Sequence, residues 1–261
     1  NAFSLIQKEE IVNDAYFKNI ILNLKVCDVV ILNGEGGIYD LQPKGVMTLF
    51  IAYIAKVKFD KIVALVNHTT DISHPIMKEI VANVYPVLDN IVYRENISFS
   101  TVSKEISLKN SYLGTDAAFN IVNSKDFSKI KDYNPENYRG IYPEEGFSMP
   151  SKKPIVCISG SSILFRKDRP KPQYPVISGI SELVSLLRSK NIEVIFLAAD
   201  ANDYKLLKPV SVYSKVPIIS ASTPTFDNLG LLSNVDCVIS GRWHLSILSC
   251  CVGTPIILGD A

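Results

Sequence analysis

Strand-like and helix-like patterns alternate along most of this chain, and that alternation restricts the fold more than any other feature. Short runs of β-branched and other apolar residues, typical of buried strands, are followed by stretches with helical spacing. The predicted strands are residues 28–32, 61–66, 90–93, 154–159, 193–198, 236–239 and 255–258. The predicted helices are residues 16–24, 44–55, 75–88, 98–106, 176–190 and 243–251. This order predicts an α/β fold with mainly parallel sheets covered by helices.

The alternation is interrupted once, between residues 120 and 153. This stretch holds three prolines and several charges without a steady period, as a connection between lobes would. We therefore predict two lobes, residues 1–150 including a linker at 120–150, and residues 151–261. A length of 261 residues suits two domains of ordinary size. Two doubly wound Rossmann-like lobes would bind ligands at the carboxyl ends of their strands, in a cleft between the lobes.

Composition excludes several classes of protein. The 27 Lys and Arg residues balance 26 Asp and Glu residues, so we expect no nucleic-acid partner. No apolar run approaches the ~20 residues of a membrane span. The five cysteines lie in apolar patterns without metal-ligand spacing, which indicates reduced core residues and no metal site. We expect a cytoplasmic location, including the cytoplasmic membrane face, or the Golgi lumen in a eukaryote; the sequence does not indicate the oligomeric state.

The strongest candidate site lies in a predicted strand, turn and helix near the end of the chain. Strand 236–239 leads through Gly241 into helix 243–251, so Arg242 and His244 fall at the first turn of that helix. Free backbone N–H groups and the positive end of the helix dipole favour an anion there. A lone histidine in a core helix is usually structural, but the adjacent arginine favours a site role. Both positive charges disfavour the imidazolium, so we expect a neutral imidazole that can accept a proton.

Three further candidates lie in the first lobe. The motif NGEGG at residues 33–37 follows a predicted strand, and its glycines can bring backbone N–H groups close to a ligand oxygen. A plain strand-to-helix turn explains the glycines equally well, but Glu35 between them suits a hydroxyl acceptor or general base. Arg94 ends another strand, where a surface arginine is as plausible as a site residue. Asp116 lies in a stretch of small and apolar residues, where an unpaired carboxylate would be costly.

Other polar residues carry weaker signals. Residues 159–162 (SGSS) follow the first strand of the second lobe and precede the basic residues of 166–169, which together could bind a phosphate. A solvated basic loop explains those charges more simply. His68 and His74 flank the end of a strand, but two scattered histidines are poor evidence of a metal. We expect Trp243 to pack inward, with stacking on a sugar as the lesser alternative.

Six segments together resemble the polysaccharide pyruvyl transferase family in their order and spacing. They are DVVILNGEGG (28–37), VYRENIS (92–98), TDAAF (115–119), VCISGSS (156–162), FLAADANDY (196–204) and VISGRWHLSILSCCVGTPII (238–257). The resemblance implies a GT-B-like pair of Rossmann lobes. It also implies transfer of pyruvyl from phosphoenolpyruvate onto two hydroxyls of a sugar in a polysaccharide or glycan, which makes a cyclic ketal and releases phosphate. Two features depart from the family: Trp243 replaces a common leucine, and an opening strand with a Gly-Asp loop and a final helix are not evident.

By that likeness Arg242 and His244 should hold the donor, with His244 as the catalytic residue; Arg242 and Glu35 are further catalytic candidates. The predicted donor site comprises Arg94, Ser159, Gly160, Ser161, Gly241, Arg242 and His244. The predicted acceptor site comprises Asn33, Gly34, Glu35, Gly36, His68 and Asp116. We expect no cofactor besides phosphoenolpyruvate as donor substrate. The main alternative is a GT-B nucleotide-sugar glycosyltransferase, and a third possibility is a non-catalytic carbohydrate-binding or scaffold protein.

Overall fold

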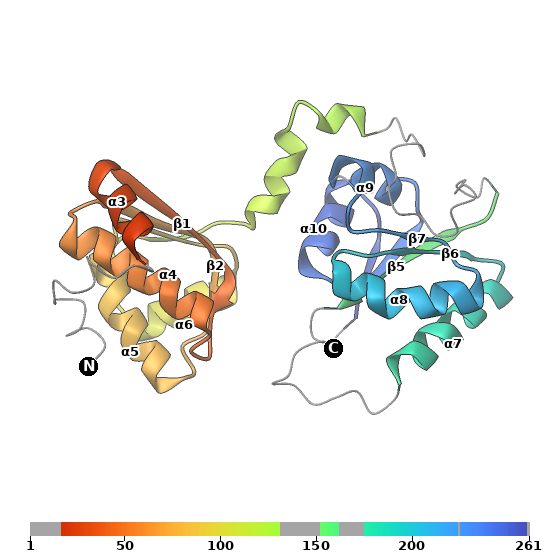
Figure 1. Cartoon of the computed structure of the whole chain (residues 1–261), viewed down its shortest axis with the longest axis horizontal. Helices are drawn as coiled ribbons and strands as arrows, with labels where there is room; N and C mark the ends of the chain where they lie inside the picture. Colours follow the sequence, from red (N-terminus) through yellow and green to blue (C-terminus); the bar gives the residue numbers. More distant parts are fainter. Residues whose placement is uncertain (1–16, 131–151, 162–174, 224, 260–261) are drawn as a thin grey trace. The chain divides into compact units, whose positions relative to one another are not determined.

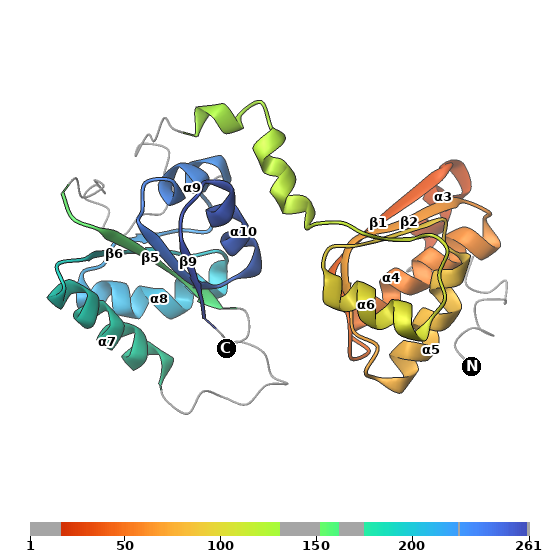
Figure 2. The same cartoon turned by 180° about the vertical axis from the view of Figure 1, so that it is seen from behind.

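A computed structural model describes residues 17–130, 152–161, 175–223 and 225–259. The chain divides into two compact units, Asn1–Ala117 and Ala118–Ala261, and each has its own parallel sheet (Figures 1 and 2). The predicted α/β class with two sets of parallel strands is therefore confirmed. The described part of the predicted linker forms short 3₁₀ helices, Ala117–Asn123 and Phe127–Lys129. The predicted lobe boundary near residue 150 lies outside the described residues and stays a prediction.

The first unit holds a four-stranded sheet in the order β1-β2-β3-β4. Its strands are β1 (Val29–Ile38), β2 (Ile62–Thr70), β3 (Asn90–Tyr93) and β4 (Ser111–Leu113). Its helices are α3 (Lys18–Val26), α4 (Pro43–Tyr53), α5 (Pro75–Val84) and α6 (Asn96–Glu105). A π turn, Ile54–Lys58, extends α4, and a 3₁₀ turn, Tyr85–Val87, extends α5.

One apolar cluster joins these helices to the first sheet. It contains alternate strand residues such as Val63 and Leu65, which are fully buried. Because side chains alternate across a strand, the residues between them point to the opposite face. That face carries exposed apolar side chains, namely Val29, Ile31, Ile62 and Tyr112. Among the described residues, β1 also has no strand paired along its outer edge.

The second unit holds a five-stranded sheet in the order β7-β6-β5-β8-β9. Its strands are β5 (Ile155–Ser161), β6 (Glu193–Leu197), β7 (Ile218–Ile219), β8 (Cys237–Gly241) and β9 (Ile256–Leu258). Its helices are α7 (Val176–Ser189), α8 (Ala201–Ser214), α9 (Thr225–Leu232) and α10 (Trp243–Cys251).

Helices cover both faces of the second sheet, and a separate apolar cluster lies on each face. Cys157 and Val238 pack with α9 and α10, whereas Ile158 and Phe196 pack with α7 and α8. The strand order reverses at β5, because β6 and β7 lie on one side of it and β8 and β9 on the other. The second unit is thus doubly wound as predicted, and its switch point lies between β5 and β8, where ligands of such sheets bind.

Two strands extend further than the sequence indicates. β1 continues through the NGEGG motif, and β2 continues past His68, so the strand-to-helix turn that was one of the two alternatives for residues 33–37 is wrong. The glycines serve close strand pairing instead, since a Cβ on Gly34 would lie only 2.7 Å from the Cβ of His68. Glu35 pairs with His68 but adopts a φ of 45°, and the register shifts after it. The irregular carboxyl end of β1 thus keeps the NGEGG motif paired with β2.

Candidate functional site

The carboxyl ends of β5 and β8 meet at the switch point of the second sheet. Ser161 and Gly241 are register partners there. A Cβ on Gly241 would lie 2.5 Å from both the Cβ and the Oγ of Ser161, so glycine allows the two strand ends to come together. The sequence therefore needs a glycine directly before Arg242 for packing, in addition to any role in binding.

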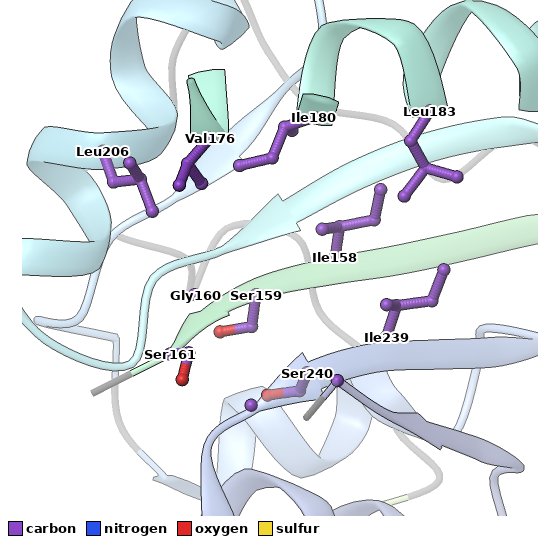
Figure 3. Close-up of a pocket in the computed structure, with 12 residues that line it drawn as sticks. Ile158, Ser159, Gly160, Ser161, Val176, Ile180, Leu183, Leu206, Ile239 and Ser240 are labelled. Atoms are coloured by element: carbon purple, nitrogen blue, oxygen red, sulfur yellow. The ribbon is translucent and has the colours of Figure 1, made fainter. Parts of the chain in front are cut away.

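A pocket of about 210 Å³ lies beside these strand ends (Figure 3). Apolar side chains of β5, β8, α7 and α8 form most of its lining, including Ile158, Ile180 and Ile239. Ser159 and Ser240 add hydroxyl groups. The Ser159 hydroxyl is buried and has no hydrogen-bond partner among the described residues. An unpaired buried hydroxyl in a pocket is available to a ligand or a water molecule.

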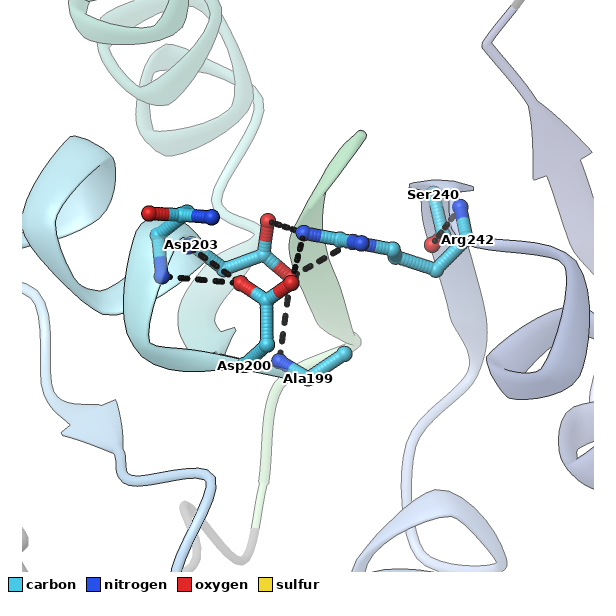
Figure 4. Close-up of polar contacts among 6 residues, drawn as sticks. Ala199, Asp200, Asp203, Ser240 and Arg242 are labelled. Atoms are coloured by element: carbon cyan, nitrogen blue, oxygen red, sulfur yellow. Dashed lines mark hydrogen bonds and ion pairs between the residues drawn. The ribbon is translucent and has the colours of Figure 1, made fainter. Parts of the chain in front are cut away.

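Arg242 is held by two carboxylates at the start of α8, from the N-cap residue Asp200 and from Asp203 in the first helical turn (Figure 4). Its Nε donates to Oδ2 of Asp203 at 2.9 Å, and its Nη2 donates to Oδ1 of Asp203 at 2.7 Å. Nη2 also lies 2.7 Å from Oδ2 of Asp200. Nη1 has no partner within the described part of the chain. The guanidinium that was expected to face a donor is therefore already paired along one edge.

The two aspartates differ in their surroundings. Asp203 is fully buried, and Asp200 is half-exposed and caps α8 by accepting the N–H groups of Asn202 and Asp203. Burial by itself would raise the pKa of Asp200, but the N–H of Asp203 and the charge of Arg242 outweigh it and lower that pKa. The lowered pKa favours the carboxylate form of Asp200 beside Arg242.

His244 lies where the sequence places it, in the first turn of α10. Arg242 is the N-cap residue, and no side chain caps the helix. The N–H of Ser246 bonds to the Arg242 carbonyl at 3.0 Å, so the N–H of His244 precedes the first such bond of the helix. The His244 side chain is exposed and has no hydrogen bond or ion pair among the described residues. Trp243 is 50% exposed, so the expectation that it packs inward is wrong.

A second cluster lies at the carboxyl ends of the strands in the first unit. Nη1 of Arg94 donates to Oδ2 of Asp116 at 2.9 Å, and the two side chains are only 10% and 3% exposed. Nε of Arg94 donates to the Thr69 hydroxyl at 2.9 Å. Gly36 lies beside the same guanidinium, since a Cβ there would be 3.1 Å from Nη2. Asp116 therefore has the charged partner that its burial requires.

Asn67 joins the strand ends of this cluster and was not among the predicted site residues. Its Nδ2 donates to Oδ1 of Asn33 at 3.1 Å, and its Oδ1 accepts the N–H of Ala117 at 2.9 Å. Asn67 has a φ of 52°, in the same left-handed region as Glu35 on the adjacent strand. Such backbone is uncommon for residues other than glycine and often occurs at functional sites. Glu35 itself pairs with Lys44 at 2.9 Å.

His68 is fully buried beside this cluster. Its Nδ1 lies 3.0 Å from the Val92 carbonyl, which can only accept, so Nδ1 carries the proton and Nε2 has no partner among the described residues. Its ring stacks at 4.6 Å from the ring of Tyr93. Burial is the largest cause that lowers the His68 pKa to about 4; the bond to Val92 opposes it and the charge of Arg94 adds to it. The imidazole is thus neutral near pH 7.

The predicted residues form two groups that match the two units. In the first unit lie Asn33, Gly34, Glu35, Gly36, His68, Arg94 and Asp116. In the second unit lie Ser159, Gly160, Ser161, Gly241, Arg242 and His244. Arg94, which was predicted for the donor site, is thus in contact with acceptor candidates. Ser162 and the basic residues of 166–169 lie outside the described residues.

Asp200 and Asp203 were not among the residues predicted for the site. A signal was present, because the segment DAND follows a predicted strand and contains a helix-capping residue at its start. What the sequence does not reveal is that this turn reaches an arginine 39 residues away along the chain.

Other kinds of site receive no support from the described residues. No group of three His, Cys, Asp or Glu side chains among them could hold a metal ion. No described helix is both long enough and apolar enough to cross a bilayer.

The family model of polysaccharide pyruvyl transferase matches residues 2–258. No curated protein matches the chain. The match covers both units, and it includes the Arg242 and His244 turn together with the cluster around Arg94.

Several solved structures share the fold. UDP-N-acetylglucosamine 2-epimerase from Rickettsia bellii is 11% identical with a TM-score of 0.57, over 92% of this chain and 58% of that protein. A glycosyltransferase from Rickettsia africae is 13% identical with a TM-score of 0.54, over 98% and 64% of the two chains. MnaA of S. aureus, solved with UDP, is 10% identical with a TM-score of 0.56, over 99% and 64%. This chain spans less than two thirds of their length, and at such identity they show the GT-B-like fold alone.

Proposed function

The chain belongs to the polysaccharide pyruvyl transferase family, and on that premise we propose that it transfers pyruvyl from phosphoenolpyruvate onto two hydroxyls of one sugar in a glycan. The observation that carries the proposal is the family match over nearly the whole chain, with Arg242 and His244 at the start of α10 beside the switch point of the second sheet. That position offers an anion the N–H groups of a first helical turn together with a guanidinium.

The chemistry requires groups that bind an anion and move protons. The methylene carbon of phosphoenolpyruvate takes up a proton, and one sugar hydroxyl bonds to the central carbon. Phosphate then leaves, and the second hydroxyl bonds to the same carbon to close the ketal. The two sugar hydroxyls lose two protons in all. One accounts for the proton taken up by the methylene carbon, and the other leaves with the phosphate. An imidazole close to the donor suits such exchanges.

In this proposal the donor lies against the first turn of α10. The uncapped N–H groups there and Nη1 of Arg242 would bind its charged groups and stabilise charge as phosphate leaves. The exposed imidazole of His244 would exchange protons with the donor or with the attacking hydroxyl. The hydroxyls of Ser159 and Ser161 lie at the adjoining strand end and support binding of the phosphate. No metal is required for these steps.

The acceptor roles follow from the first unit. The Glu35 carboxylate is half-exposed, so it is the candidate for orienting a sugar hydroxyl. Asp116 is buried against Arg94 and would act on a ligand only by holding that arginine. His68 is fully buried, and we propose that it supports Gly34 and the strand ends instead of contacting the sugar.

His244→Ala tests the proposal directly. Loss of a proton-transfer group should lower phosphate release from phosphoenolpyruvate, in the presence of an acceptor glycan, by about 100-fold or more. The matched control is His74→Ala, since His74 is also a histidine at a helix start but only caps α5. Near-normal turnover by His244→Ala would contradict the catalytic assignment.

Ligand binding distinguishes the proposed function from the alternative, a nucleotide-sugar glycosyltransferase. Phosphoenolpyruvate should raise the thermal unfolding temperature of the chain, because a ligand that binds only the folded form stabilises it. A panel of nucleotide sugars should have no such effect. Stabilisation by nucleotide sugars alone would replace the proposal with a glycosyltransferase activity.

A further inference from the structure

The Asp203 side chain is fixed firmly within the second unit. It is fully buried, and its Oδ2 accepts the N–H of Ala199 at 3.1 Å. Its own N–H bonds to the capping carboxylate of Asp200 at 2.9 Å. The carboxylate also lies directly against Gly160 of β5, where any Cβ would collide with it. A carboxylate with so little freedom is a rigid anchor for whatever it binds.

Arg242 connects this anchor to the start of α10. Two parallel hydrogen bonds join its guanidinium to Asp203, which fixes the orientation of the planar group. Its backbone is held as well, because its N–H donates to the Ser240 hydroxyl at 2.9 Å and its carbonyl accepts the N–H of Ser246. Arg242 is therefore held at both its guanidinium and its backbone, two residues before His244.

The connection crosses the sheet. α8, which carries Asp203, packs on one face of the second sheet, whereas α10 packs on the other. The ion pair spans the carboxyl edge over β5 and links the two layers at the switch point (Figure 4). Loss of one partner would leave a charge in a mostly buried position, so each group depends on the other.

The charges around Arg242 also indicate that this residue positions the turn more than it binds an anion. Arg242 contributes one positive charge, and Asp200 and Asp203 contribute two negative charges, which gives the trio a net charge of −1. A phosphoenolpyruvate anion gains little from a guanidinium that is already compensated in this way. The main contribution of Arg242 is then geometric, apart from its remaining Nη1 group.

We infer that Asp203 is a positioning residue of the donor site, which acts through Arg242 to hold the first turn of α10 and thereby His244. The inference rests on the proposed function for its catalytic meaning. Its structural content can be measured without substrate, because Trp243 lies between Arg242 and His244 and is the single tryptophan of the chain.

Quenching of Trp243 fluorescence by acrylamide measures the order of this turn. Asp203→Asn removes the charge but keeps the shape of the side chain, so the unit should stay folded. Because Trp243 is already 50% exposed, release of the turn should raise its acrylamide quenching constant only moderately, by about 1.5- to 2-fold. Arg242→Lys should give the same rise, because lysine cannot make the paired contact.

The double variant tests whether the two residues act as one unit. If Asp203 acts through Arg242, the quenching constant of Trp243 in the double variant, Asp203→Asn with Arg242→Lys, should be no higher than in either single variant. Asp236→Asn is the control, because the Asp236 carboxylate accepts the N–H of Ile155 at the opposite end of the sheet. The quenching constant of Trp243 in this variant should equal that of the wild type. Circular dichroism verifies that each variant is folded.

Two results would overturn the inference. An unchanged quenching constant in Asp203→Asn would show that the turn does not depend on the carboxylate. Additive increases in the double variant would show that Asp203 acts by another route. If phosphoenolpyruvate changes neither the Trp243 fluorescence nor the unfolding temperature of the wild-type chain, that result counts against the proposed function only, since the quenching measurements contain no substrate.

Discussion

At the scale of single residues, His68 makes the first unit sensitive to acid. Its pKa of about 4 in the folded chain lies below the ordinary value of 6.5, so the unfolded chain binds more protons between these values. The free energy of unfolding therefore falls as the pH falls through this window and is unaffected by His68 above it. Between pH 7 and pH 5 we expect a loss of about 2 kcal/mol from this group.

Urea unfolding of the whole chain at pH 7 and pH 5 measures this loss, because circular dichroism follows both units whereas Trp243 fluorescence follows the second unit alone. His68→Asn is the matched variant, because its amide can still donate to the Val92 carbonyl while it has no group that titrates in this range. The variant should lose less stability than the wild type on acidification. Equal losses in both proteins would mean that His68 is not the group responsible.

The residues also differ in how far the sequence could predict them. Asp116 was expected to need a partner because of its apolar surroundings, and Arg94 fills that need. The position of Arg242 and His244 at a helix start was predicted because strand, glycine and helix signals are local. The pairing of Arg242 with Asp203 was not predicted, because it depends on which helices cross the same sheet edge.

At the scale of elements, strands and helices with strong periodicity were predicted closely. α10 has the predicted bounds, and Gly253 ends that region with a φ of 79°, as a left-handed stop. β1 and β2 were predicted too short, since polar and glycine residues at their ends do not resemble buried strand. β4 has only three residues and was missed.

The contact between β5 and β8 gives a prediction about glycine. Gly241→Ala would place a methyl group against Ser161, so we expect a loss of about 1–3 kcal/mol in the free energy of unfolding. Gly179→Ala, inside α7, meets no atom within 4 Å and should stabilise the helix by up to about 1 kcal/mol. Urea unfolding followed by Trp243 fluorescence compares the two, and similar effects would contradict the close-packing argument.

At the scale of the whole molecule, the chain consists of two units with separate sheets and separate apolar clusters. The two-lobe organisation could be predicted because one irregular segment interrupts the alternation. The order of the strands could not, because periodicity does not identify the neighbours of a strand. The doubly wound order is present in the second sheet, and the described part of the first sheet runs in simple sequence.

Separate clusters predict separate unfolding. Trp243 reports on the second unit, whereas circular dichroism reports on both. Acidification from pH 7 to pH 5 should lower the stability of the first unit through His68 and leave the urea midpoint of Trp243 fluorescence unchanged. Coincident midpoints that shift together would show that the two units unfold as one.

The outer edge of β1 and the apolar face beside it affect how the chain behaves in solution. No described strand pairs with that edge, and its backbone groups, next to exposed Val29 and Ile31, favour self-association of neighbouring copies as concentration rises. A lysine in place of Ile31 would add charge to that rim without entering the apolar cluster. It is the simplest change for keeping a purified sample monodisperse during crystallisation or spectroscopy.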